Sequence, residues 1–306
     1  MRIVVTGSTG FIGTALVRAL VGRGDDVVCL IRPATTSRRS EVTNNVREWN
    51  PSAGVLNPDD VNGSDAVIHL AGEGIGERKW TPTQKQRIVE SRTTSTALLA
   101  NTIAGVPEPP ALFLSGSAIG YYGDTGQIAV DEHVAPGHDF TAQVCVAWEH
   151  AAGPAAEAGI TTTFLRTGLV LAAHGGVLKR MLLPFRLGLG GRSGSGNQWM
   201  SWISLRDEVA AIIHLIDTPI DGPVNLTAPE PVTNRDFVSA LGHALHRPTI
   251  LPTPRLPLYA KFGKELVDTL MFASQRVLPS ALLESGFQFR DTTIQECFAN
   301  LSDAAS

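Results

Sequence analysis

The sequence predicts an α/β fold in which a doubly wound parallel sheet carries a smaller C-terminal lobe. Three observations support this class. Short apolar runs rich in β-branched residues alternate with helical patterns over the first 170 residues, as βαβ units require. Three regularly spaced glycines follow the first of these runs. From Leu178 onward, glycine is mixed with aromatic and basic residues, a composition that suits the walls of a pocket better than a core.

The first segment contains a strand, a glycine-rich turn and a helix. Residues 3–5 form a β-branched run typical of a buried parallel strand, and residues 14–20 have the spacing of a helix. Between them stand Gly7, Gly10 and Gly13. In this order, backbone N–H groups and a helix N-terminus can hold a pyrophosphate, so the segment predicts a dinucleotide-binding sheet of the Rossmann type. The glycines alone are weak evidence, and the flanking strand and helix give them weight.

The end of the second strand bears on the choice of cofactor. Residues 26–31 predict a buried strand, and Arg32 follows where an NAD-type sheet usually has an acidic residue for the ribose diol. A basic residue there, supported by Ser37, Arg38 and Arg39, suits the 2′-phosphate of NADP. A solvated basic loop is the alternative. We therefore expect NADP(H).

A third strand and a long helix come next. Residues 65–72 predict a strand that ends in a glycine turn, and the backbone of its last three residues should border the cofactor. His69 lies within this strand and is expected to be a buried structural residue. Pro82 opens a helix that runs to about residue 104 and carries Arg87 and Arg92. These two arginines could either contact the cofactor or be solvated at the surface.

The following elements complete the parallel sheet. Residues 111–114 predict a strand, and the Ser-rich, Tyr-containing turn at 115–123 leaves it where a reductase of this fold places its proton donor. Residues 139–158 predict one long helix, and residues 161–166 predict another strand. Ligands of such sheets bind at the carboxyl ends of the strands.

The remaining chain is expected to form mainly the smaller lobe. We assign residues 1–177 to the dinucleotide-binding domain, with segments at about 201–230 returning to it, and residues 178–306 mainly to a substrate-binding lobe. Residues 204–207 resemble a capping box, so Asp207 is expected to cap a helix rather than to act as an acid. A late strand is expected at 284–289.

Composition excludes several classes of protein. The chain has 306 residues, 43% apolar and 18% charged, and a formal net charge of −4, which gives no footprint for nucleic acid or an anionic membrane. No apolar stretch reaches the roughly 18 residues of a membrane span, and the first strand begins without a cationic leader. Cys29, Cys145 and Cys297 lack the spacing of a metal site. We expect a reduced, cytoplasmic protein, either monomer or homodimer.

Several sequence blocks resemble a known family. The opening at 6–13 and the turn at 69–72 are similar to the extended short-chain dehydrogenase/reductases, the nucleotide-sugar epimerase superfamily. Blocks over nearly the whole chain resemble an atypical subfamily, labelled epimerase family proteins and mostly unassigned in reaction. These blocks are residues 71–73, 78–80, 91–92, 120–123, 183–191 and 276–279.

The resemblance implies an NADP(H) site and a substrate cleft between that site and the block at 183–203. The cofactor contacts that it implies, together with those expected above, are Gly7, Thr9, Gly10, Phe11, Ile12, Gly13, Ile31, Arg32, Leu70, Ala71, Gly72, Arg87, Arg92, Ser115 and Val170.

The resemblance also implies a catalytic serine, tyrosine and lysine, and here the sequence departs from the family pattern. Ser117 takes the position of the family serine that binds the reacting oxygen. When Glu149 is placed on the glutamate that often follows the tyrosine and lysine, their positions fall on Thr141 and Cys145. A threonine hydroxyl is too weakly acidic to replace a phenol, and a cysteine has no positive charge to lower a neighbour's pKa.

A substitute for the missing groups is available nearby. Tyr121 or Tyr122 could supply the phenol, and Arg87 or Arg92 the positive charge, although the tyrosines could instead pack the turn. Ser117 and Tyr121 are the predicted catalytic residues. The candidate substrate contacts, each with packing or surface charge as its alternative, are Glu73, Trp80, Tyr122, Arg186, Gln198 and Trp202.

Two functions follow from these expectations. The first is an NADP(H)-dependent oxidoreductase or epimerase that acts on a carbonyl or secondary alcohol of a small molecule. Lys179 and Arg186 favour an anionic or nucleotide-linked substrate, and surface charge explains them nearly as well. The second is an NADP(H)-sensing binding protein without turnover, which the missing tyrosine and lysine support and the elaborate pocket block argues against. The fold alone does not distinguish them.

Overall fold

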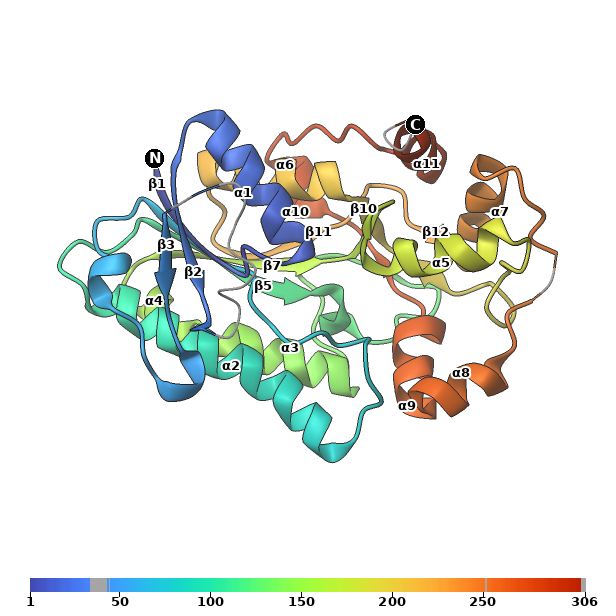
Figure 1. Ribbon diagram of the computed structural model, residues 1–306, viewed down its shortest axis with the longest axis horizontal. Coiled ribbons are helices and arrows are strands. Elements are labelled where there is room, and N and C mark those ends of the chain that lie inside the picture. The colour runs from blue at the N-terminus through green and yellow to red at the C-terminus, as the bar shows by residue number, and fades with distance from the viewer. Residues whose placement is uncertain (34–42, 44, 251, 304–306) are drawn as a thin grey trace.

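The computed structural model describes residues 1–33, 43, 45–250 and 252–303. At its centre lies a seven-stranded sheet in the order β11-β7-β5-β4-β1-β2-β3, with every neighbouring pair parallel (Figure 1). The predicted fold class, an α/β protein with a Rossmann-like parallel sheet, is confirmed. The strands are β1 Arg2–Thr6, β2 Asp26–Ile31, β3 Val46–Glu48, β4 Ala66–His69, β5 Leu112–Ala118, β7 Thr161–Thr167 and β11 Gly222–Leu226.

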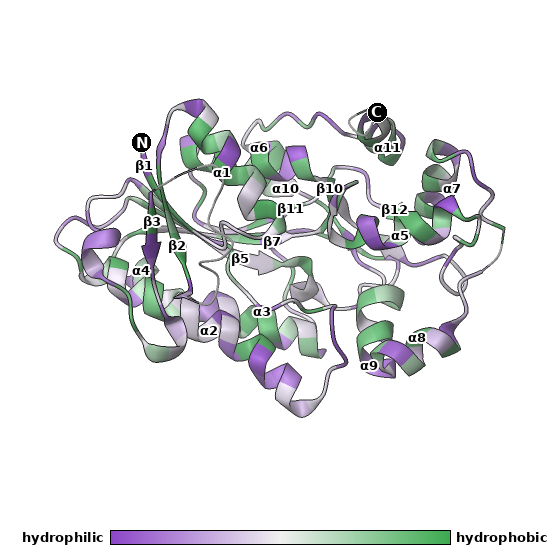
Figure 2. Ribbon diagram, viewed as in Figure 1, coloured by the Kyte–Doolittle hydropathy of each residue, from purple (hydrophilic) through white to green (hydrophobic). Residues whose placement is uncertain are grey.

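Helices cover both faces of the sheet, which explains why the inner strands β1, β2 and β4 are mainly apolar. One face packs on α1 Phe11–Arg23, α6 Leu205–Asp217 and α10 Ser280–Glu284, and the other on α2 Pro82–Gly105, α3 Phe140–His150 and α4 Gly153–Glu157 (Figure 1). Figure 2 shows the contrast between the hydrophobic inner strand β2 and the hydrophilic edge strand β3. The carboxyl ends of the strands are therefore the exposed edge on which a ligand site can form.

β11, α6 and α10 return to the central sheet, and other segments after β7 form a second apolar cluster, which includes Phe185, Trp202, Phe237 and Phe298. Around this cluster, the short strand β8 pairs in parallel with β10, and β9 pairs antiparallel with β12. A third short pair, β13 with β6, is parallel and lies beside the turn η4 Ile119–Tyr122. The predicted domain boundary at residue 177 stays a prediction. The remaining elements are β6 Ala129–Val130, β8 Leu169–Ala172, α5 Gly176–Arg186, β9 Trp199–Met200, β10 Trp202–Ser204, β12 Val232–Thr233, α7 Asn234–Ala244, α8 Arg255–Phe262, α9 Lys264–Val267, η5 Asp268–Phe272, β13 Arg276–Val277 and α11 Ile294–Asp303, with short turns η2 Pro51–Ala53 and η3 Pro58–Asp60.

Two predicted elements differ from the structure. The helix predicted over 139–158 is broken into α3 and α4, because Pro154 lacks the backbone N–H that would continue the helix and its ring crowds the preceding turn. No strand forms over 284–289. Phe287 and Phe289, which gave that stretch its alternation, pack on each other with ring centroids 4.8 Å apart and join the cluster beneath α6.

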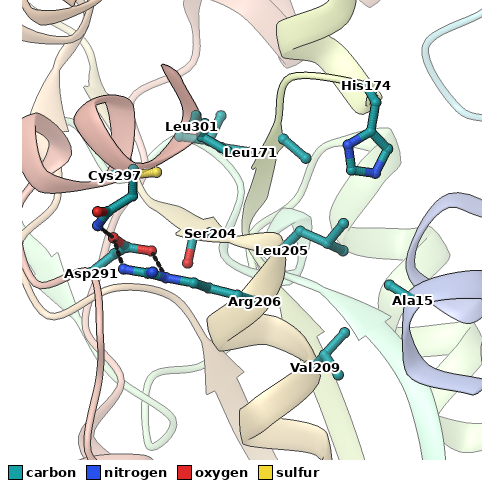
Figure 3. A pocket seen from close by; sticks show the side chains of 12 residues that line it. Ala15, Leu171, His174, Ser204, Leu205, Arg206, Val209, Asp291, Cys297 and Leu301 are labelled. Carbon is teal, nitrogen blue, oxygen red and sulfur yellow. Dashed lines mark hydrogen bonds and ion pairs between the residues drawn. The ribbon is translucent and has the colours of Figure 1, made fainter. Parts of the chain in front are cut away.

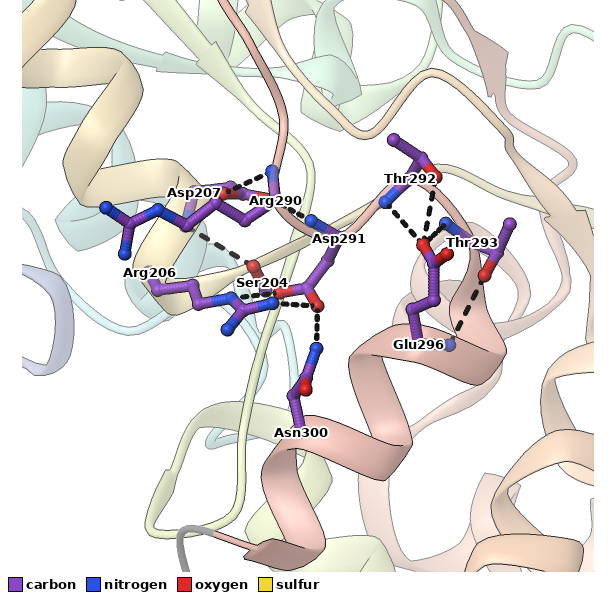
Figure 4. Close-up of polar contacts among 9 residues, drawn as sticks. All are labelled: Ser204, Arg206, Asp207, Arg290, Asp291, Thr292, Thr293, Glu296 and Asn300. Carbon is purple, nitrogen blue, oxygen red and sulfur yellow. Dashed lines mark hydrogen bonds and ion pairs between the residues drawn. The ribbon is translucent and has the colours of Figure 1, made fainter.

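The C-terminal segment is fastened to the start of α6 (Figure 4). Ser204 caps this helix as expected, since its hydroxyl accepts from the N–H of Asp207 at 3.3 Å. The Asp207 carboxylate does not close a capping box. It accepts from the N–H groups of Arg290 and Asp291, the latter at 2.8 Å, and the Asp291 carboxylate pairs with Arg206. Across the described part of the chain, no helix is long and apolar enough to cross a membrane.

Candidate functional site

The glycine turn after β1 is packed against the end of β4. Gly7 adopts a φ of 70°, and a Cβ there would lie 2.6 Å from the carbonyl carbon of Leu70. A Cβ on Gly13 would lie 2.1 Å from the carbonyl oxygen of Gly7. Both positions therefore admit only glycine, and the turn is closed by a hydrogen bond from the N–H of Gly10 to Gly7 O at 2.9 Å.

The helix α1 begins directly after this turn. Gly10 is the capping residue and offers no side chain, and the first turn, with Phe11, Ile12 and Gly13, contains no acidic residue. The N–H groups at the start of a helix have no intrahelical partner, and the helix dipole favours negative charge there. The cradle of Gly7 and Gly13 beside this N-terminus fits the pyrophosphate of a dinucleotide, and the predicted contact Thr9 belongs to the same turn.

The residues predicted to select NADP follow β2. Ile31 ends the strand with 4% of its surface exposed, and the exposed Arg32 comes directly after it. Ser37, Arg38 and Arg39 lie outside the described residues. The preference for NADP over NAD thus stays a prediction that Arg32 carries.

Arg92 lies against the end of β4. A Cβ on Gly72 would be 3.4 Å from Cζ of Arg92, so the guanidinium covers the turn that Leu70 and Ala71 begin. Arg92 donates to Ile88 O at 3.1 Å, and its guanidinium lies 4.9 Å from the ring of Trp148. Burial lowers the pKa of Arg92, and the nearby Cys145 and Glu73 act in the opposite direction. Arg87 is exposed on the same helix, and its contact with the cofactor stays a prediction.

His69 is fully buried, as expected for a structural residue. Its Nδ1 is 2.6 Å from Thr6 Oγ1 and its Nε2 is 3.1 Å from Ser95 Oγ. Burial lowers the pKa of His69 to about 3, so the ring is neutral at physiological pH. The chain of hydrogen bonds fastens the end of β1 to α2 and so fixes the glycine turn that follows.

The predicted contacts Ser115 and Val170 flank the same edge. Ser115 is fully buried on β5, and within the described chain its hydroxyl has no hydrogen-bond partner. Val170 lies on β8, and the turn after this strand packs closely against Phe11. A Cβ on Gly175 in that turn would be 2.2 Å from the Phe11 ring. The structure thus brings β8 alongside the start of α1.

A buried polar network surrounds Ser117. Its hydroxyl donates to Glu149 Oε1 at 2.6 Å, and Arg166 donates to both oxygens of that carboxylate, through Nε at 2.8 Å and Nη2 at 2.9 Å. Arg166 Nη1 donates to the Tyr122 hydroxyl at 2.9 Å, which in turn donates to Asn225 Oδ1 at 2.8 Å. The Glu149 carboxylate raises the pKa of Arg166 against the effect of its burial. The network fixes one orientation for each of its members.

The two tyrosines of η4 have different surroundings. Tyr122 is 5% exposed with its hydroxyl inside the network, and burial raises its pKa to about 12, so it is a poor proton donor. The packing alternative fits Tyr122. Tyr121 is half-buried, and the guanidinium of Arg166 lies 3.4 Å from its ring. Of the pair, Tyr121 stays the candidate catalytic residue.

The positions of the missing tyrosine and lysine are covered by η4. A Cβ on Gly120 would lie 3.1 Å from Cβ of Thr141 and 3.8 Å from Sγ of Cys145. Thr141 donates to Asp139 Oδ1 at 2.6 Å, and burial raises the pKa of Cys145 to about 12. Neither side chain is suited to transfer a proton near neutral pH, and both are buried against Gly120.

Two predicted substrate contacts belong to the loop between β4 and α2. Trp80 donates to Ile75 O at 2.9 Å and packs edge-on against Phe140, so it anchors the loop, which fits its packing alternative. Glu73 is half-buried, and its N–H donates to Ser91 Oγ at 3.1 Å. The Glu73 carboxylate stays a candidate substrate contact.

The other three predicted substrate contacts lie beyond β8. Trp202 is fully buried in the second apolar cluster and donates to Glu230 O at 3.0 Å, so packing accounts for it. Gln198 is 8% exposed and its amide donates to the carbonyl oxygens of Ser193 and Met271. Arg186 is exposed at the end of α5 and stays a candidate for an anionic substrate group.

A separate cavity of about 410 Å³ lies between α1, α6 and α11 (Figure 3). Its walls are mainly apolar, with the Arg206–Asp291 ion pair on one side, and it contains none of the predicted site residues. Over the described residues, no group of three or more His, Cys, Asp or Glu side chains could hold a metal ion.

The sequence reading did not identify Glu149, Arg166 and Asn225 as members of the site. Arg166 gave a usable signal, because an arginine within a buried parallel strand requires a buried partner. No comparable signal marks Glu149 on α3, and the role of Asn225 depends on the pairing of β11 with β7.

Comparison with known proteins places this geometry in a family. The sequence pattern of the "NAD dependent epimerase/dehydratase family" matches residues 3–227, and that of "Domain of unknown function (DUF1731)" matches residues 253–301. An epimerase family protein of Mycobacterium bovis is 42% identical over 96% of this chain and 95% of its own length.

Solved structures agree with this relationship. The structure of the human epimerase family protein SDR39U1 with NADPH is 31% identical, covers 99% of both chains and has a TM-score of 0.87. A nucleoside-diphosphate sugar epimerase of Corynebacterium glutamicum is 32% identical over all of this chain and 60% of its own, with a TM-score of 0.79. The resemblance to the epimerase family proteins of the extended short-chain dehydrogenase/reductases is confirmed, and the chain belongs to the NAD dependent epimerase/dehydratase family.

Proposed function

We propose that this chain is an NADP(H)-dependent oxidoreductase or epimerase that acts on a carbonyl or secondary alcohol of a small molecule. The observation that carries the proposal is the cradle of Gly7 and Gly13, closed against β4, at the strand edge where Ser117 also lies. The NADPH bound by the human relative supports the choice of cofactor.

The chain's own residues would divide the work as follows. The glycine turn and the start of α1 bind the pyrophosphate, Arg32 binds the 2′-phosphate, and Arg92 lies beside the turn after β4. The cofactor, when bound, supplies hydride donation or acceptance. Ser117 contacts the reacting oxygen, and the half-buried Tyr121 of η4 is the candidate phenol.

A second candidate, an NADP(H)-sensing protein without turnover, is favoured by one observation. Thr141 and Cys145 are buried beneath η4, so the helix offers neither of the usual proton-transfer groups. In this candidate the protein binds NADP(H) at the same site but catalyses no hydride transfer.

The cofactor assignment is tested by fluorescence titration. NADPH is expected to bind more tightly than NADH, and Arg32→Glu is expected to reverse that preference, because a carboxylate repels the 2′-phosphate and accepts from a ribose hydroxyl. Arg18→Glu makes the same charge change on the exposed side of α1 and should leave the preference unchanged. If Arg32→Glu keeps the wild-type preference, the assignment is wrong.

Turnover is tested by a screen for NADPH oxidation with carbonyl compounds and nucleotide sugars. A substrate that oxidises NADPH supports the enzyme. Silence across all classes, together with a protein partner recovered in only one redox state of the cofactor, would support the sensor instead.

A further inference from the structure

The hydroxyl group of Ser117 is fixed in direction by its buried neighbour. Ser117 is the residue before the last of β5, lies in register with Arg166 of β7 and is 5% exposed. Its Oγ lies 2.6 Å from Glu149 Oε1, a short distance typical of a hydroxyl that donates to a carboxylate. A serine hydroxyl has one proton and two lone pairs, so this single bond uses its only donor.

Glu149 can accept hydrogen bonds and cannot donate them. Arg166 donates to both of its oxygens, and the two side chains are 12% and 4% exposed, so the pair is held away from solvent. Both oxygens of the Glu149 carboxylate accept from the guanidinium, so the group faces Ser117 as an acceptor. The hydrogen bond between Ser117 and Glu149 therefore has only one possible direction.

Nothing in the network allows Ser117 to turn away easily. The third nitrogen of the Arg166 guanidinium donates to the Tyr122 hydroxyl, which donates to Asn225. Any rotation of Ser117 toward the cleft would remove one charge-assisted bond from Glu149, and such bonds are about twice as strong as neutral ones. The lone pairs of Ser117 are thus the part of the group that a ligand can use.

We infer that Glu149 is a positioning residue that makes Ser117 a hydrogen-bond acceptor, so the substrate group bound there carries an O–H. The ligand class is a secondary alcohol, not a ketone or an ether. A hydroxyl donates to Ser117 Oγ, whereas a carbonyl oxygen would face the serine lone pairs without a proton between them. This inference rests on the proposed function, because it assigns the substrate form that the proposed site prefers.

Equilibrium binding separates this inference from a serine that donates. The probes are 1-phenylethanol, its methyl ether and acetophenone, which share one carbon skeleton and of which only the alcohol has a donor. The alcohol and the ether are titrated into the protein with NADPH, and acetophenone into the protein with NADP⁺, so that no turnover occurs. The alcohol is expected to bind roughly two- to tenfold more tightly than either other probe, the range of one net hydrogen bond.

Two variants identify the residues responsible. Ser117→Ala leaves the Glu149–Arg166 pair intact and should bring the three affinities within about twofold. Glu149→Gln, checked for folding by its thermal transition, removes the obligatory acceptor and should reduce the ratio between alcohol and acetophenone. Ser64→Ala, a buried serine whose hydroxyl donates to Val61 O away from this edge, is the matched control and should keep the wild-type ratio.

Each outcome has a definite meaning. If acetophenone or the ether binds wild-type protein as tightly as the alcohol, or if Ser117→Ala keeps the preference, the inference is wrong and the proposed function stands. If the protein binds NADPH but none of the three probes up to their solubility, the proposed substrate class fails and the inference fails with it. If Glu149→Gln does not fold, Ser117→Ala alone decides.

Discussion

Glu208→Gln is expected to make the stability of this protein less sensitive to pH between 4.5 and about 8. Glu208 is fully buried in the first turn of α6, where Thr167 Oγ1 donates to its Oε1 at 2.9 Å. Within the part of the chain that the structure describes, Oε2 has no hydrogen-bond partner. Burial therefore raises the pKa of Glu208 to about 8.

The sign of the effect follows from proton binding in the two states. The unfolded chain loses this proton near pH 4.5, whereas the folded protein keeps it until about pH 8. Between these values the folded state holds one more proton, so the free energy of unfolding falls by about 1.4 kcal/mol for each unit of rising pH. The whole window sets an upper bound of about 5 kcal/mol, and below pH 4.5 the contribution is constant.

Urea unfolding followed by tryptophan fluorescence measures the difference at several pH values between about 5 and about 8. Stability of the glutamine variant relative to wild type should rise steadily with pH. Burial also raises the pKa of Asp207 and of Glu132, but these groups add the same slope to both proteins. Glu157→Gln, at an exposed position of α4, should follow wild type. Parallel stability curves for Glu208→Gln and wild type would refute the reasoning.

Three further predictions concern the site. Gly13→Ala should weaken NADPH binding roughly tenfold or more in a fluorescence titration, because its methyl group would lie 2.1 Å from Gly7 O, whereas Gly22→Ala on the same helix meets nothing within 4 Å and should bind normally. Arg166→Met should lower the free energy of unfolding by about 3–5 kcal/mol, because it leaves Glu149 buried without its ion-pair partner. The double variant Arg166→Met with Glu149→Leu should recover much of that loss, and equal stability of the single and double variants would contradict this. Tyr121→Phe should lower any NADPH-dependent turnover with little change in stability, whereas Tyr122→Phe should cost about 1–2 kcal/mol of stability; unchanged turnover in Tyr121→Phe would remove it from the catalytic set.

The sheet could be predicted from the sequence because its strands β1, β2 and β4 are buried on both faces and therefore consist of short runs rich in β-branched residues. The break between α3 and α4 could also have been read, since Gly153 and Pro154 stand side by side in the chain. The late strand failed for another reason. Phe287 and Phe289 have the two-residue spacing of a strand, but the reason for this spacing is that both rings pack beneath α6. Periodicity reports which residues are buried, and it does not report whether a partner strand exists.

The cofactor turn was also accessible from the sequence, because its requirement is local. Gly7 and Gly13 are constrained by backbone atoms a few residues away or at the end of the adjacent strand. The surroundings of Ser117 were not accessible, because they join β5, α3, β7 and β11. Trp202 is another example of this limit. Its neighbours in the glycine-rich block suggested a pocket, whereas its contacts in the structure are those of a core residue.

The contact between η4 and α3 links the missing tyrosine and lysine to the rest of the site. Because Gly120 lies against Thr141 and Cys145, a tyrosine or lysine at either position would require η4 to move away from the helix. Moving η4 would also displace Tyr122 from its hydrogen bonds with Arg166 and Asn225, and thereby loosen the pair that orients Ser117. The loss of the usual helix residues and the fixed direction of the serine are therefore parts of one packing arrangement. Under the proposed function, proton transfer falls to Ser117 of β5 and Tyr121 of η4, and we expect Thr141→Tyr to destabilise the fold rather than to restore activity.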